Sequence, residues 1–206
     1  MKDARVPIVL AIDENYILQA AVAIYSLLSK GLTNKESLIV ILIKGEISKD
    51  GLSLLEILKK KYAYCEFKII SVDDSIFSFV ELQTKRLTNT TLYRLILPEI
   101  LNQYKQCIYL DADTLVTGDI SELLDIDMSG VYLAGVIDKK IQEKKEYEKE
   151  IGLPHLKEYI NAGILVMNLE LMCKEEKSKE FLALINNKYL FDDQDVLNIS
   201  CYGHIK

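Results

Sequence analysis

The chain has 206 residues, of which 50% are hydrophobic and 27% charged, and its formal net charge is −6. A chain of this length buries about 70% of its unfolded surface, so one domain around one large core is expected. Nine glycines and three prolines are too few for a collagen-like, low-complexity or proline-rich chain, and the negative charge argues against nucleic acid as a partner.

Short β-branched runs alternate with longer helical patterns along the chain, which is typical of parallel strands joined by crossover helices. The predicted strands are residues 6–12, 38–44, 66–72, 107–111, 131–137 and 162–168. The predicted helices are residues 17–30, 49–62, 91–103 (bent or broken by Pro98), 142–151, 170–186 and 193–200. The sequence therefore predicts an α/β fold with one open sheet covered by helices on both faces.

The cysteines and the N-terminal residues indicate in which cellular compartment the protein is expected. Cys65, Cys107, Cys173 and Cys201 stand singly with no CxxC spacing, so we expect buried thiols in a reducing compartment, not disulfides or metal ligands. The apolar run 6–12 ends at Asp13 and is too short for a membrane span or a signal peptide. We therefore expect a cytoplasmic protein with no integral membrane segment.

Residues 139–150 read KKIQEKKEYEKE and intersperse both signs of charge. This pattern indicates a solvated helix or a mobile loop. A flexible lid over a site is the alternative.

Two aspartates at the end of the fourth predicted strand are the strongest candidate site. Residues 108–117 read IYLDADTLVT, so Asp111 and Asp113 follow an apolar strand at its carboxyl end, where open α/β sheets bind ligands. Two close carboxylates repel each other unless a cation neutralises them. The pair therefore favours a divalent metal that carries a phosphate. A turn that uses aspartate side chains for backbone hydrogen bonds is the alternative.

Polar side chains also stand near the ends of other predicted elements. They are Asp13, Asn15 and Tyr16 after the first strand, Arg94 in the third helix, Asn161 at the sixth strand, and Asp193 and Gln194 in the last helix. Next to Asn161, the small residue Ala162 allows a close approach to the backbone. Some of these polar residues could instead have a purely structural role. Asn15 could cap a helix, Arg94 could form a surface ion pair, and the acidic turn 192–195 could be favoured by the dipole of the last helix.

Five ordered segments carry a resemblance to a known family. AIDENY, TTLYRL, YLDADTLV, INAGILVMNL and DDQDVLN resemble the family 8 glycosyltransferases, which include bacterial lipopolysaccharide α-galactosyl- and α-glucosyltransferases. The resemblance implies a single GT-A (Rossmann-like) domain over residues 1–206, with a mostly parallel mixed sheet. It also implies retaining transfer of a hexose from UDP-glucose or UDP-galactose to a carbohydrate or glycolipid acceptor.

The resemblance further implies roles for individual residues. Asp111 and Asp113 would bind Mn²⁺, with Mg²⁺ as an alternative, and the metal would bridge the diphosphate and stabilise the UDP leaving group. The implied nucleoside and donor-sugar residues are Ala11, Asp13 or Asn15, Tyr16 stacked on the uracil, Ala112, Arg94, Asn161, Ala162, Asp193 and Gln194. Asp193 and Gln194 are the catalytic candidates. Glutamine is a poor nucleophile, so Gln194 would act electrostatically or by positioning.

One family motif has no counterpart in this sequence. The family pattern continues into His-x-x-Gly-x-x-Lys-Pro-Trp, whose His completes the metal site and whose Lys contacts the diphosphate. The chain has two histidines, His155 and His204, and His204 lacks the rest of the motif. We therefore expect a surface role for His204, a chain truncated at its C-terminus, and weak donor binding and transfer by this chain. Peripheral membrane association through the missing region is a further expectation.

Two other functions stay open at this point. One is a non-catalytic domain that binds a nucleotide sugar without turnover. The other is a haloacid-dehalogenase-type phosphohydrolase that depends on Mg²⁺, in which Asp111 would attack phosphorus and Asp113 would act as general acid and base.

Overall fold

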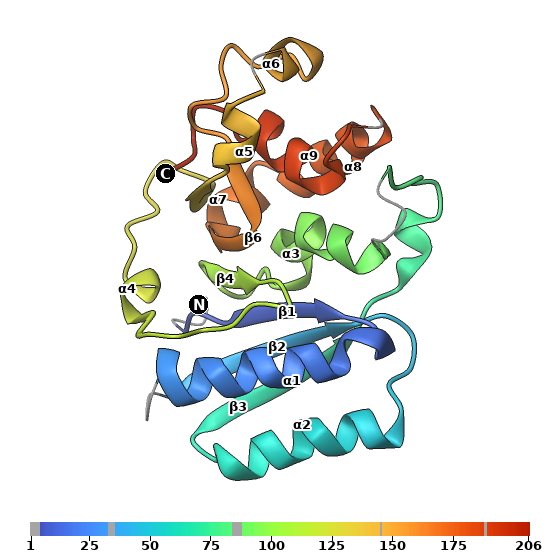
Figure 1. Cartoon of the computed structure of the whole chain (residues 1–206), viewed down its shortest axis with the longest axis vertical. Helices are drawn as coiled ribbons and strands as arrows, with labels where there is room; N and C mark the ends of the chain where they lie inside the picture. The colour runs from blue at the N-terminus through green and yellow to red at the C-terminus, as the bar shows by residue number, and fades with distance from the viewer. Residues whose placement is uncertain (1–4, 33–35, 84–87, 145, 188) are drawn as a thin grey trace.

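The computed structural model describes residues 5–32, 36–83, 88–144, 146–187 and 189–206, and its centre is a six-stranded sheet (Figure 1). The strands are β1 (Ile8–Ile12), β2 (Ser37–Ile43), β3 (Cys65–Ser71), β4 (Cys107–Leu110), β5 (Leu133–Ile137) and β6 (Ile160–Met167). The α-helices are α1 (Ile17–Ser26), α2 (Lys49–Lys61), α3 (Leu97–Ile100), α4 (Ser121–Leu124), α5 (Lys139–Gln142), α6 (Tyr147–Glu150), α7 (Leu169–Lys174), α8 (Lys177–Leu184) and α9 (Asp192–Ser200). The remaining helical segments are η1 (Glu14–Tyr16), the π-helical turn η2 (Leu27–Gly31), η3 (Asp74–Phe77), η4 (Asn89–Ile96) and η5 (Ile185–Asn187).

The strand order is β3-β2-β1-β4-β6-β5. The pairs β2·β3, β1·β2 and β1·β4 are parallel, whereas β6 pairs antiparallel with both β4 and β5. The α/β fold with a mostly parallel mixed sheet is confirmed. The strand pattern alone favoured parallel pairing throughout, which is wrong at β6. Among its described residues, the connection from β5 to β6 forms the short helices α5 and α6, and it returns the chain in the opposite direction.

The central strands of the sheet are buried on both faces. All five residues of β1 are buried, which suits the continuous apolar run of a central parallel strand. Val9 and Val40 pack in the cluster that includes residues of η4, α3 and α7 to α9, whereas Ile8 and Ile39 pack in the cluster that includes residues of α1 and α2. The expected cover of helices on both faces is confirmed.

Three predicted helices differ in the structure. Residues 91–103 form the 3-10 segment η4 and then α3, which has Pro98 in its first turn, where the missing N–H costs no hydrogen bond. Of the predicted helix 142–151, Gln142 is the last residue of α5 and residues 147–150 form the separate short helix α6. Residues 170–186 are divided between α7 and α8 because Glu176 adopts a left-handed conformation (φ 55°).

Several local predictions are also decided by the structure. Cys65, Cys107 and Cys201 are buried thiols, but Cys173 is exposed on α7, so burial of all four was wrong. His204 is exposed, as predicted. Among the described helices, none combines the length and the apolar character that a membrane span requires.

Candidate functional site

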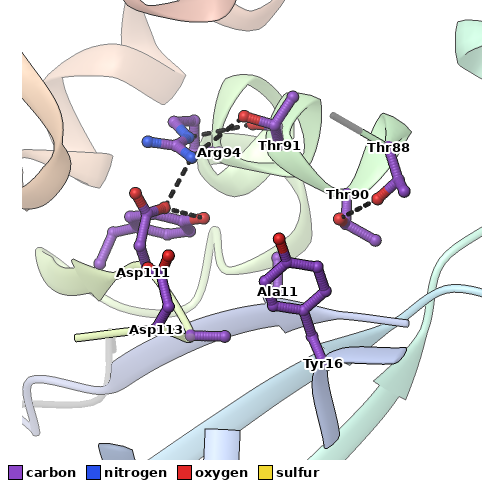
Figure 2. A pocket seen from close by; sticks show the side chains of 10 residues that line it. Ala11, Tyr16, Thr88, Thr90, Thr91, Arg94, Asp111 and Asp113 are labelled. Atoms are coloured by element: carbon purple, nitrogen blue, oxygen red, sulfur yellow. Dashed lines mark hydrogen bonds and ion pairs between the residues drawn. The ribbon is translucent and has the colours of Figure 1, made fainter. Parts of the chain in front are cut away.

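The site lies where β1 and β4 end beside each other. The two strands are parallel neighbours, with Ile8 opposite Ile108, so the segments that follow them emerge at the same edge of the sheet. The hollow at this edge is lined by Ala11, Tyr16, Thr88, Thr90, Thr91, Arg94, Tyr109, Asp111, Ala112 and Asp113 (Figure 2). β1 and η1 supply the first two, residues in and just before η4 supply the next four, and β4 with its following turn supplies the last four.

A second hollow adjoins the first and shares Thr91, Arg94 and Asp111 with it. It is also lined by Asn161, Ala162, Gly163, Phe191, Asp193 and Gln194, which come from β6, α9 and the residue before α9. Asp192 begins α9 with φ 42°, a left-handed conformation that aspartate tolerates better than most residues. The acidic turn therefore places Asp193 and Gln194 beside β6.

The two hollows together contain most of the predicted site residues. The structure brings together Ala11, Tyr16, Arg94, Asp111, Ala112, Asp113, Asn161, Ala162, Asp193 and Gln194. Asp13 and Asn15 line neither hollow. Asp13 caps η1, because its Oδ1 accepts a hydrogen bond from the backbone N–H of Asn15 at 2.9 Å. Helix capping by Asn15 is therefore wrong: the cap of this turn is Asp13, and Asn15 supplies only the backbone N–H from which Asp13 accepts.

Arg94 joins the two hollows through its guanidinium group. Its Nη2 lies 2.8 Å from Asp111 Oδ1 and its Nε lies 2.9 Å from Asp193 Oδ2. Nη1 donates to the carbonyl of Ala162, and the group lies 4.4 Å from the centre of the Tyr109 ring. The Arg94 side chain is 5% exposed. A surface ion pair for Arg94 is therefore wrong, because both of its charged partners belong to the site.

Burial and neighbouring charges have opposite effects on the pKa values of Arg94 and Asp193. Burial lowers the pKa of Arg94, but the charges of Asp193 and Asp111 outweigh it and raise the pKa above the ordinary value. Loss of hydration raises the pKa of Asp193 to about 6, against the opposing effects of Arg94 and of the Thr91 hydroxyl. Arg94 thus forms ion pairs with two carboxylates, and the first hollow holds a third carboxylate, that of Asp113.

Asp111 is held so that one of its oxygens stays available. Oδ1 accepts from Arg94 and, at 3.1 Å, from the Tyr109 hydroxyl. The backbone N–H of Asp111 donates to the carbonyl of Gly163 at 2.8 Å, which continues the pairing of β4 with β6. A Cβ on Gly163 would lie 2.7 Å from Asp111 Oδ2, so this glycine leaves room for that oxygen.

The donor set fits a hard divalent cation. Asp111 Oδ2 and the exposed Asp113 carboxylate supply oxygen ligands of the kind that Mn²⁺ and Mg²⁺ bind. Within the part of the chain that the structure describes, no three His, Cys, Asp or Glu side chains form a metal-binding group. The two aspartates would therefore leave most of the coordination sphere to water or to a ligand's phosphate.

Gln194 is fixed by hydrogen bonds at both ends of its amide. Its Oε1 accepts from the backbone N–H of Ala162 at 3.0 Å and from Asn161 Nδ2 at 3.2 Å. Its Nε2 donates to Asp138 Oδ2 at 3.2 Å and to the Tyr159 hydroxyl at 3.4 Å. The orientation of the amide follows from these partners, because only the oxygen can accept from an N–H.

Sequence reasoning missed several residues that line the hollows. They are Thr88, Thr90, Thr91, Tyr109, Gly163 and Phe191. Two of them could have been found from spacing. Tyr109 precedes Asp111 by two residues, so both point to the same side of β4. Thr91 precedes Arg94 by three residues, which is one turn of the 3-10 segment.

The sequence matches a known family and is similar to known proteins over nearly its whole length. The family model described as glycosyl transferase family 8 matches residues 7–206. A Haemophilus influenzae protein described as a glycosyltransferase is 32% identical over 203 residues, which cover 97% of this chain and 60% of that protein. A lipopolysaccharide 1,2-glucosyltransferase of Escherichia coli is 28% identical over 201 residues, covering 95% and 58%. The chain therefore spans about 60% of the length of these relatives.

A solved structure is similar over nearly the whole chain. The galactosyltransferase LgtC, in complex with donor and acceptor sugar analogs, aligns with a TM-score of 0.86 at 27% identity. The alignment covers 97% of this chain and 72% of LgtC.

Proposed function

The chain belongs to glycosyltransferase family 8, and we propose that it transfers a hexose from UDP-glucose or UDP-galactose to a carbohydrate or glycolipid acceptor, with retention of configuration. The observation that carries the proposal is the joining of the two hollows through Arg94 and Asp111. Around them lie an aromatic ring suited to a base, a carboxylate pair suited to a metal–diphosphate, and amides suited to sugar hydroxyls. Relatives that are named as lipopolysaccharide glucosyl- and galactosyltransferases support a bacterial envelope glycan as the acceptor class.

The proposal assigns the first hollow to the nucleotide. Tyr16 ends η1 directly before α1, beside the hollow, and would stack on the uracil, which an aromatic ring can bind without a charge. The backbone of Ala11 at the end of β1 would complete the nucleoside site. Asp111 and Asp113 would hold Mn²⁺ or Mg²⁺, which when bound neutralises negative charge on the diphosphate.

The second hollow would hold the donor sugar. Asn161 and Gln194 present amide groups there, and Asp193 lies beside them with its carboxylate paired to Arg94. Gln194 carries no charge and its oxygen already accepts two hydrogen bonds, so it suits positioning and not covalent attack. Arg94 keeps Asp111 and Asp193 at fixed places and lets two carboxylates lie near each other.

Of the two other functions that the sequence left open, one is now excluded. Membership of glycosyltransferase family 8 overturns the phosphohydrolase reading of Asp111 and Asp113. A non-catalytic domain that binds a nucleotide sugar would use the same nucleotide site, and turnover measurements separate it from the transferase. The buried thiols of Cys107 and Cys201 support our proposal of a reducing, cytoplasmic location, where nucleotide sugars are available.

Titration calorimetry with UDP tests the nucleotide site. We expect binding in Mn²⁺ and a large loss of affinity in EDTA. Asp113→Asn should weaken the metal effect, whereas Asp125→Asn, at an exposed aspartate that lines neither hollow, should leave it unchanged. Equal affinity in Mn²⁺ and in EDTA would refute the metal–diphosphate site. UDP binding without release of UDP from either donor would favour the non-catalytic alternative.

A further inference from the structure

A buried carboxylate behind the sugar hollow has no part in the proposed chemistry. Asp195 is fully buried in α9, one residue after Gln194, and lines neither hollow. Its Oδ1 accepts from the Tyr159 hydroxyl at 2.5 Å. Its Oδ2 accepts from the Tyr147 hydroxyl at 2.5 Å and from the backbone N–H of Phe191 at 2.7 Å.

The charge of Asp195 is supported by hydrogen bonds and not by a cation. Among the described residues, no lysine, arginine or histidine forms an ion pair with it. A buried carboxylate is expensive unless its lone pairs are satisfied, and three donors satisfy them here. In this arrangement both oxygens of Asp195 accept hydrogen bonds, and the residue lines neither hollow.

The Tyr159 hydroxyl connects Asp195 to Gln194. This hydroxyl has one proton, which it donates to the carboxylate, so it can only accept the proton of Gln194 Nε2. The second Nε2 proton goes to Asp138. Tyr159 thus fixes which end of the Gln194 amide faces away from Ala162.

The Tyr147 hydroxyl connects the same carboxylate to the charged segment 139–150. Tyr147 begins α6 and is 5% exposed, and Ile141 of α5 is 2% exposed. Asp138, which binds Gln194, also caps α5 by accepting from the N–H groups of Lys140 and Ile141. The charged segment is therefore attached to α9 through Tyr147, and Asp138, the residue directly before it, binds Gln194 of the same helix (Figure 1).

Resting on the proposed function, we infer that Asp195, Tyr147 and Tyr159 are positioning residues for the transfer reaction. Asp195 aligns the Tyr159 hydroxyl, Tyr159 holds the Gln194 amide toward the sugar hollow, and Tyr147 couples this alignment to the docking of α5 and α6. The carboxylate acts through the two tyrosines and does not touch the substrate.

Single hydroxyl deletions test the inference with little change in volume. The variants are Tyr159→Phe and Tyr147→Phe, and the matched control is Tyr202→Phe. Tyr202 packs against the same small core cluster, and its hydroxyl forms its hydrogen bond with His155 at 3.1 Å and not with Asp195 or Gln194. Three readouts are needed: the side-chain amide NMR signal of Gln194, assigned by its loss in Gln194→Glu; hydrogen exchange in peptides covering α5 and α6; and the release of UDP from UDP-glucose and UDP-galactose.

We expect Tyr159→Phe to move the Gln194 signal and to lower kcat about tenfold, the effect of one lost hydrogen bond, with KM for the donor nearly unchanged. Tyr147→Phe should speed exchange in α5 and α6. Tyr202→Phe should do neither at a comparable melting temperature. An unmoved Gln194 signal in Tyr159→Phe overturns the inference, as does a kcat loss in all three variants that follows their melting temperatures.

The two proposals fail in distinguishable ways. If the wild-type chain does not bind UDP, the proposed function fails, and the NMR and exchange experiments still decide whether Asp195 and the tyrosines hold Gln194 and the segment. If UDP binds and turns over but Tyr159→Phe keeps full kcat, the transferase stands and the positioning role is refuted.

Discussion

Replacing Arg94 with methionine should strongly destabilise the fold. Methionine keeps much of the aliphatic volume but removes the guanidinium that lies 2.8 Å from Asp111 and 2.9 Å from Asp193. Asp111 is partly exposed and can be rehydrated, whereas Asp193 is 4% exposed and cannot. The variant therefore leaves one buried carboxylate without its cation, together with an unpaired carbonyl at Ala162.

The expected loss in the free energy of unfolding is about 3–5 kcal/mol, the usual cost of removing one partner from a buried ion pair. This is a large part of the 5–15 kcal/mol that a domain of ordinary stability has. Adding Asp193→Asn to Arg94→Met removes the orphaned charge, so the double variant should be less destabilised than the sum of the two single variants, by about 1–3 kcal/mol.

Urea unfolding followed by circular dichroism at pH 7 measures these differences. Lys59→Met is the control, because Lys59 and Glu56 form an exposed ion pair on α2 and its loss should cost under about 1 kcal/mol. The reasoning would be refuted if Arg94→Met cost no more than Lys59→Met, or if the two site substitutions were simply additive.

Three further predictions concern the same domain. Gly163→Ala should reduce the affinity for UDP in Mn²⁺ by calorimetry, since its Cβ would lie 2.7 Å from Asp111 Oδ2, whereas Gly118→Ala, with no atom within 4 Å of its Cβ, should not; equal affinities would contradict this. The pKa of Asp193 is raised to about 6 in the folded state, so its contribution to stability is fully present below about pH 4 and is lost as the pH rises through 6. In urea unfolding between pH 4 and 7, the free energy of unfolding of Asp193→Asn should therefore change less with pH than that of the wild type. Lys177→Met should cost about 1–3 kcal/mol in thermal unfolding, because the buried ammonium group donates to the Ser200 carbonyl at 2.7 Å and to its hydroxyl at 3.0 Å; an unchanged melting temperature would contradict it.

The strands were predictable because burial on both faces leaves a direct trace in the sequence. β1 and β2 consist almost wholly of apolar residues, many of them β-branched, and no helical spacing competes with that pattern. The direction of β6 was not predictable in this way, because the pattern of one strand carries no information about which way its neighbour runs. The break at Glu176 also lacks a local signal, since no glycine or proline marks it.

The site was predictable where two features coincided. A strand end and a carboxylate pair marked Asp111 and Asp113, and an isolated cation in an apolar helix marked Arg94. The pattern gave no way to assign partners to Arg94, because Asp193 is 99 positions away in the sequence and reaches it only through the packing of α9 against η4. Tyr159 was missed for the same reason, since an aromatic residue before a strand is ordinarily core.

The balance of charge around Arg94 supports the proposal that a diphosphate binds here together with a metal. The guanidinium is already shared between Asp111 and Asp193, so it has little positive potential left for a phosphate. Across the two hollows, Asp111, Asp113 and Asp193 accompany the single cation Arg94. The joined hollows therefore carry a net negative formal charge, as does the whole chain. A dianionic ligand would be repelled from such a hollow. A divalent cation at Asp111 and Asp113 would reverse the local sign, so on the proposed function we expect nucleotide affinity to depend on metal more strictly than at a site with a free arginine.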